Sequence, residues 1–145
     1  MNCDIIYNIK EMKYSLTRLR NPEVLARGFH KGYNYFVVNY GTHPCAYVVI
    51  AKGQPYYSTV GSHDVEIECH GGCTFLEWGY RGIIEDSYKV IGWDYSHIGD
   101  FSGSYLSDAG FGRSLHKWTT EEMVEDCIHA IEQLYVLEHR ELYYK

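Results

Sequence analysis

The stretch Thr119–Tyr135, TTEEMVEDCIHAIEQLY, decides the fold class of this chain. Thr119 is followed three residues later by Glu122, which is the spacing of a capping box at a helix N-terminus. Apolar residues then recur at helical spacing from Met123 to Tyr135. The pattern predicts a helix over about residues 120–138, whose apolar stripe packs on a sheet or, alternatively, on a partner helix in an oligomer.

The residues before this helix are typical of β-strands. β-Branched and aromatic residues fill Tyr33–Asn39, and a turn returns the chain through residues 45–51, which predicts a hairpin. Residues 64–70 alternate strictly between polar and apolar, the pattern of a half-buried strand. Strands followed by a final helix predict an α+β domain with a mostly antiparallel sheet packed against the C-terminal helix. Further strands are predicted at residues 4–9, 74–80 and 89–95.

Proline and glycine mark the remaining segments. Pro22 can start a helical turn through Ala26 that Gly28 would end. Residues 96–117 are rich in glycine and serine, which predicts a long, partly mobile loop. Loops of this length are often functional.

Length and composition set broad limits. With 145 residues, the chain is expected to form a single domain over residues 1–145. No apolar run approaches the roughly 20 residues that cross a membrane, and the opening residues do not resemble a signal peptide, so no membrane partner is expected. The five cysteines are odd in number and scattered, which favours a reduced cytoplasmic protein with free thiols.

The charge distribution indicates the kind of partner. A net charge of −6 argues against general nucleic-acid binding through phosphates. Residues 1–31 carry six cationic and three acidic side chains, whereas residues 119–145 carry seven acidic and two cationic ones. A small anionic ligand could lie against the basic N-terminal third; alternatively, the two ends attract each other or are simply solvated. The 15 tyrosines suit a sheet surface or an interface, and we expect a homo-oligomer.

Two glycine-rich segments concentrate the residues that do chemistry, HGGCTF at His70–Phe75 and GWDYSHIGD at Gly92–Asp100. Glycine lets the backbone approach a ligand closely, and histidine and aspartate supply proton transfer, metal ligation or polar recognition. Folded together, the segments would form one polar cavity. The candidate ligand-binding residues in them are His70, Gly71, Gly72, Thr74, Trp93, Asp94, His97 and Asp100.

Several of these residues have a structural alternative. Trp93 could stack on a flat base or lie in the core. His70 could cap the Gly71–Gly72 turn, and Asp94 and Asp100 could accept backbone N–H groups in turns.

Arginines complete the predicted site. Arg27, Arg81 and Arg113 have no local partner, and any of them could pair with a phosphate. Arg27 and Arg113 are the two that we assign to the ligand.

The same polar residues also fit a metal. Asp94, His97 and Asp100, with His70, suit a site of oxygen and nitrogen ligands, or general acid–base chemistry. No complete catalytic set is visible, so no catalytic residue, metal ligand or cofactor is assigned. A divalent metal enters only under the alternative of a phosphohydrolase.

The motifs also carry a resemblance. H-G-G-x-T-[FY], then G-[WF]-D-x-x-H-x-G-D, then W-T-x-E-E before the final helix resembles a group of small phage and prophage proteins of unsettled function. The opening residues 7–12 and 20–22 look similar to that group too, so that the resemblance covers about half of the chain. Cys73 stands where the group has an aliphatic residue, which makes a role for this thiol doubtful. The resemblance implies an anti-defence protein that sequesters a nucleotide-derived immune signal of the host.

The sequence therefore predicts a binding module for a small anionic, nucleotide-like ligand rather than an enzyme. A first alternative is a metal-dependent phosphohydrolase that degrades such a signal. A second is an inhibitor that binds a host defence enzyme through its tyrosine-rich surface and acidic helix.

Overall fold

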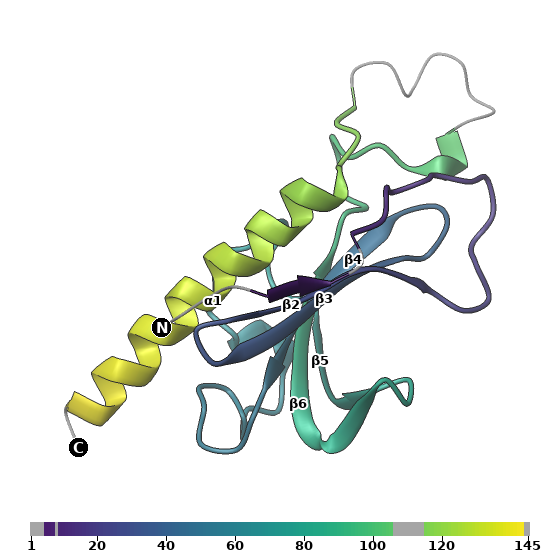
Figure 1. Ribbon diagram of the computed structural model, residues 1–145. Helices are drawn as coiled ribbons and strands as arrows, with labels where there is room; N and C mark the ends of the chain where they lie inside the picture. Colours follow the sequence, from purple (N-terminus) through teal and green to yellow (C-terminus); the bar gives the residue numbers. More distant parts are fainter. Residues whose placement is uncertain (1–4, 8, 106–114, 144–145) are drawn as a thin grey trace.

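The computed structural model describes residues 5–7, 9–105 and 115–143, and in them six strands form one sheet that packs against one long helix (Figure 1). The strand order is β1-β2-β3-β4-β6-β5, and every neighbouring pair is antiparallel, which confirms the predicted α+β class. The elements are β1 Ile5–Tyr7, β2 Glu23–His30, β3 Tyr33–Asn39, β4 Pro44–Ile50, η1 Ser62–Asp64, β5 Phe75–Tyr80, β6 Ile84–Asp94, η2 Gly103–Tyr105 and α1 Thr120–Tyr143.

The predicted helix is confirmed and is longer than expected. The capping box forms, since the Thr119 N–H donates to Glu122 Oε1 at 2.9 Å and the Glu122 N–H donates to Thr119 Oγ1 at 3.2 Å. The helix continues to Tyr143, beyond the predicted end at about residue 138. Among the described residues, no helix combines the length and apolar character needed to span a membrane.

The sheet buries apolar side chains on both faces. On the α1 face, strand residues such as Val48, Ile91 and Trp93 pack against Met123 and Leu134 of the helix. The opposite face carries a second cluster, which consists of Phe36, Val38, Tyr40, Cys45, Tyr47, Val49, Tyr80 and Val90. Because β3 and β4 are covered on both sides, they appear in the sequence as continuous apolar runs.

The prediction of a strand at residues 64–70 is wrong. The alternation is correct in that Val65 and Ile67 face the core, but the segment pairs with no strand of the described sheet. Its backbone bonds instead to Gln133 of α1, which accepts from the Glu68 N–H at 2.8 Å and donates to the Glu68 carbonyl at 2.7 Å. A helix side chain thus supplies the hydrogen bonds that a neighbouring strand would have made.

The helical turn predicted after Pro22 is also wrong, because Glu23–His30 is strand β2. Gly28 does not end a helix. A side chain there would overlap the ring of Tyr35, so that glycine makes room for this buried tyrosine. Of the predicted loop at 96–117, residues 106–114 lie outside the described residues.

Candidate functional site

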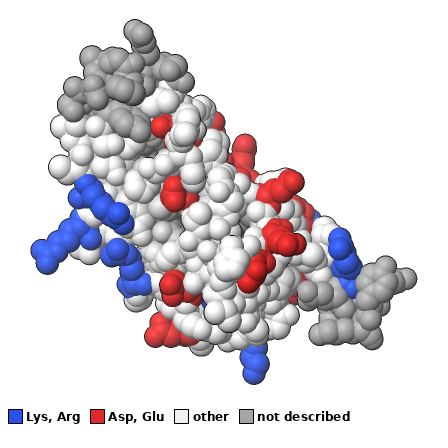
Figure 2. Space-filling view, turned by 180° about the vertical axis from the view of Figure 1, so that it is seen from behind, with Lys and Arg blue, Asp and Glu red and all other residues white. Residues whose placement is uncertain are grey.

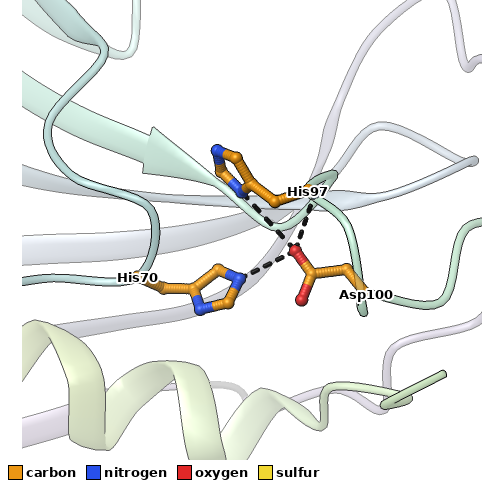
Figure 3. Close-up of side chains that lie close together, drawn as sticks. All are labelled: His70, His97 and Asp100. Atoms are coloured by element: carbon orange, nitrogen blue, oxygen red, sulfur yellow. Dashed lines mark hydrogen bonds and ion pairs between the residues drawn. The ribbon is translucent and has the colours of Figure 1, made fainter.

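Three of the predicted site residues meet at the end of the sheet near the start of α1 (Figure 3). His70 Nε2 donates to Asp100 Oδ2 at 2.7 Å, and His97 Nδ1 lies 3.5 Å from the same oxygen. One ligand-capable atom from each of the three side chains lies within 4.8 Å of the other two. The two glycine-rich segments therefore do fold together at His70, His97 and Asp100.

His70 is held by aromatic rings and by a glycine turn. Its imidazole stacks on Tyr95 with ring centroids 4.9 Å apart and lies 4.7 Å from the ring of Trp118. Gly71 and Gly72 follow with φ of +72° and +81°, a backbone conformation that favours glycine. A Cβ at Gly71 would overlap the His97 ring, so this glycine lets the turn approach His97.

Asp100 anchors the cluster. It is only 4% exposed, and its carboxylate accepts hydrogen bonds from three donors: His70 Nε2, the His97 backbone N–H at 2.9 Å and Trp118 Nε1 at 2.8 Å. Burial alone would raise the pKa of Asp100, but the bonds from the His97 backbone, His70 and Trp118 together lower it. The site therefore contains an ionised, buried carboxylate at neutral pH.

Trp93 lies behind this cluster rather than in it. The side chain is 1% exposed, and its indole N–H lies 3.0 Å from Tyr95 Oη and 3.1 Å from Asp126 Oδ2. A ring so completely buried cannot stack on a base, and the core alternative is the correct one for Trp93. The Tyr95 hydroxyl also donates to Asp126, at 2.6 Å, and burial raises the pKa of this phenol. Asp126 was not predicted as a site residue, because in the sequence it is one of several acidic residues in the helix and nothing distinguishes it from a solvent-exposed one.

Asp94 and Thr74, two further predicted site residues, do not contact the buried carboxylate of Asp100. Successive strand residues face opposite sides, so Asp94 leaves the α1 face on which Trp93 lies. Its Oδ1 accepts from the Ser96 N–H at 3.0 Å and lies 3.6 Å from His97 Nδ1, at the margin of the cluster. Thr74 is exposed, and its backbone N–H donates to Gly92 at 2.9 Å.

The structure does not bring Arg27 to the cluster. Arg27 is exposed and opposite Phe36 in the β2–β3 register, so it lies on the sheet face away from α1. His70 stacks on Tyr95, which belongs to the α1 side. Arg113 lies outside the described residues.

A second candidate site is a recess on the sheet face opposite α1. It has a volume of about 600 Å³, within the range of small-molecule sites. The sequence did not predict this recess, although two of its lining residues were named: Asp94 as a candidate ligand-binding residue and Arg81 among the arginines without a local partner. Its lining residues are Arg18, Tyr40, His43, Cys45, Tyr47, Phe75, Glu77, Trp78, Gly79, Tyr80, Arg81 and Asp94.

Three tyrosines bond to one another in this recess. The Tyr40 hydroxyl lies 2.6 Å from that of Tyr80 and 3.3 Å from that of Tyr47. Burial raises the pKa values of Tyr47 and Tyr80, so the phenols remain neutral and can donate hydrogen bonds. Burial also lowers the pKa of His43 and raises that of the Cys45 thiol to about 12, which keeps both groups uncharged at neutral pH.

Charged groups surround this neutral centre. The guanidinium carbon of Arg18 lies 4.9 Å from the centre of the Tyr40 ring, and that of Arg81 lies 5.7 Å from it. Glu77 and Asp94 add two carboxylates to the lining. Seen from behind, several basic side chains lie together at the left edge of the molecule, whereas acidic side chains are spread over the centre and the lower left, and further basic side chains lie at the right and the bottom (Figure 2).

Comparison with known protein families, with curated proteins and with solved structures finds no match to this chain.

Proposed function

We propose that this protein binds a small, nucleotide-derived molecule in the recess on the sheet face opposite α1. The observation that carries the proposal is the pair of guanidinium groups, Arg18 and Arg81, beside one ring, Tyr40, in a recess of about 600 Å³. Guanidinium groups bind phosphate through two parallel hydrogen bonds, and aromatic side chains stack on bases. This ligand class supplies both a phosphate and a flat ring.

Both arginines are available for a ligand. In the part of the chain that the structure describes, neither Arg18 nor Arg81 makes a salt bridge. Their contact with Tyr40 holds each guanidinium without neutralising its charge.

The rest of the lining complements the other parts of such a molecule. Phe75, which is partly buried on this face, offers the lining an aromatic ring on which a base could stack. Glu77 and Asp94 can accept hydrogen bonds from exocyclic amino groups or ribose hydroxyls. The residues of the recess are suited to recognition, so binding without cleavage is the function that we infer, as the resemblance to phage proteins also implies.

The test incubates the protein with a panel of cyclic dinucleotides, cyclic trinucleotides and cyclic ADP-ribose isomers. The mixtures are chromatographed before and after heat denaturation. Removal of one compound from solution, followed by its intact release on heating, is the expected result. Release of an altered compound would favour the phosphohydrolase alternative, and no uptake of any compound would contradict the proposal.

Arginine variants locate the site. A charge-assisted hydrogen bond contributes about 1.5–3 kcal/mol, so Arg18→Ala and Arg81→Ala should each weaken binding by roughly ten- to hundredfold. Arg27→Ala is the matched control, since this exposed arginine lies on the same sheet face outside the recess. Normal binding by the first two variants, or loss only in the third, would place the ligand elsewhere.

A further inference from the structure

We propose that His70, His97 and Asp100 hold one divalent transition-metal ion. Two imidazole nitrogens and one carboxylate oxygen are a donor set that suits zinc, cobalt, iron(II) or manganese. This inference goes beyond the proposed ligand function, because the recess that carries that function includes none of these three residues.

Two of the three donor–donor distances are close to those around a bound metal, and all three lie within 4.8 Å. Nitrogen and oxygen ligands about 2.1 Å from a tetrahedral ion lie about 3.4 Å from each other. His97 Nδ1 and Asp100 Oδ2 are already 3.5 Å apart. His70 Nε2 and Asp100 Oδ2, at 2.7 Å, would separate by less than an ångström as the ion replaces the proton between them.

One nitrogen of the cluster makes no hydrogen bond. His97 Nδ1 is buried and has no hydrogen-bond partner within the described structure, although it lies 3.5 Å from Asp100 Oδ2 and 3.6 Å from Asp94 Oδ1. A buried polar atom without a hydrogen bond costs roughly 1–3 kcal/mol, and such atoms call for an explanation. A metal ion bound by Asp100 would lie within reach of this nitrogen.

A purely structural role explains only part of the arrangement. The bonds between residues 97 and 100 close a turn, since the Asp100 N–H donates to the His97 carbonyl at 2.9 Å and Asp100 Oδ2 accepts from the His97 N–H. That turn needs the carboxylate and the His97 backbone, not its imidazole. It also does not require His70, which arrives from another segment.

The surroundings resemble those of metal ligands in general. Ligating carboxylates are oriented by further hydrogen bonds, and Asp100 Oδ1 accepts from Trp118 Nε1 at 2.8 Å. The ring of His70 is fixed by Tyr95 and Trp118. Three protein ligands also leave coordination positions free for water or a substrate atom.

The test is titration of the chelator-treated protein with Co²⁺, followed by visible absorption, and with Zn²⁺, followed by calorimetry. We expect one ion per chain with micromolar or tighter affinity. His97→Ala and His70→Ala should each weaken binding by roughly a hundredfold or more, because changes to second-sphere partners alone cost about ten- to hundredfold. His63→Ala is the matched control, an exposed histidine outside the cluster.

Folding and rival donors are checked in the same experiment. His97→Ala keeps the backbone N–H that Asp100 accepts, so cooperative unfolding and circular dichroism should match those of the wild type. Cys69→Ser/Cys73→Ser should bind metal as the wild type does. The proposal is overturned if the wild type binds no ion at micromolar concentration, if both histidine variants bind normally, or if binding disappears only in the cysteine variant. No nucleotide is present, so these outcomes are independent of those for the recess.

Discussion

The Tyr95 hydroxyl donates to Asp126 Oδ2 at 2.6 Å, which joins the end of the sheet to the first half of α1. The same oxygen lies 3.1 Å from Trp93 Nε1 and 3.4 Å from the His70 backbone nitrogen. A single helix carboxylate thus receives hydrogen bonds from both glycine-rich segments. This carboxylate is therefore one of the groups that hold His70 beside His97 and Asp100.

Asp126→Ala should therefore destabilise the protein strongly. The buried donors of Trp93 and Tyr95 would lose an acceptor, and each such loss costs about 1–3 kcal/mol. We expect the free energy of unfolding in urea to fall by roughly 2–4 kcal/mol. Glu125→Ala, at the neighbouring exposed position, should change it by less than about 0.5 kcal/mol. Equal effects of the two substitutions would contradict the anchoring role.

Gly71 and Gly72 allow a paired test of the turn. Both have positive φ, so alanine at either position introduces backbone strain of about 1–2 kcal/mol. A Cβ at Gly71 would also overlap the His97 ring, whereas a Cβ at Gly72 meets nothing within 4 Å. Gly71→Ala should thus displace His97 and lower stability further than Gly72→Ala.

The measurements are urea unfolding and Co²⁺ titration of both variants. Gly72→Ala should retain metal affinity close to that of the wild type, and Gly71→Ala should lose most of it. Identical metal affinities would mean that the close approach of Gly71 to His97 does not position the imidazole.

Three thiols of the native protein, those of Cys45, Cys69 and Cys127, should react slowly with alkylating reagents. Burial raises the pKa values of Cys45 and Cys69 to about 12, and it raises that of Cys127 as well. A thiol with a pKa near 12 is deprotonated in on the order of one molecule in 10⁴ at pH 8, against about a quarter for an ordinary cysteine. Iodoacetamide labelling mapped by mass spectrometry should find these three sites unmodified until denaturant is added. Rapid labelling of Cys45 in the folded protein would contradict its burial.

The parts of the fold that follow from local signals were predictable. The capping box at Thr119 and the β-branched run at Tyr33–Asn39 specify their own structure, and both predictions are confirmed. Residues 64–70 show the limit of such signals. Alternation indicates that one face of the segment is buried, but it does not indicate which groups form hydrogen bonds with the backbone. Here the partner is the side chain of Gln133 on α1, far along the chain. At β2, pairing with β1 and β3 overrides the local turn signals of Pro22 and Gly28.

The two candidate sites also differ in how far the sequence predicts them. His70, His97 and Asp100 were predicted to meet, because chemically active residues beside glycines mark turns that can converge. The recess was not predictable as a whole, since Arg18, Tyr40 and Arg81 come from separate segments and become neighbours only through the sheet order. Sequence patterns also could not decide which tryptophan is buried and which is exposed, and here Trp93 is 1% and Trp78 48% exposed.

Trp93 and Trp78 give different expectations for the same substitution. Trp93→Phe removes a buried indole N–H that contacts Tyr95 and Asp126, so the free energy of unfolding should fall by about 1–3 kcal/mol while affinity for a ligand in the recess stays the same. Trp78→Phe changes a half-exposed ring that contacts Tyr57 and the Lys89 ammonium on the sheet face toward α1. It should leave both the free energy of unfolding and the affinity for a ligand in the recess almost unchanged, because no buried polar group loses its partner and the ring does not face the recess. Urea unfolding and calorimetric titration of both variants measure the two quantities. Reduced ligand affinity in Trp93→Phe at normal stability would restore the stacking role that the sequence first suggested for Trp93.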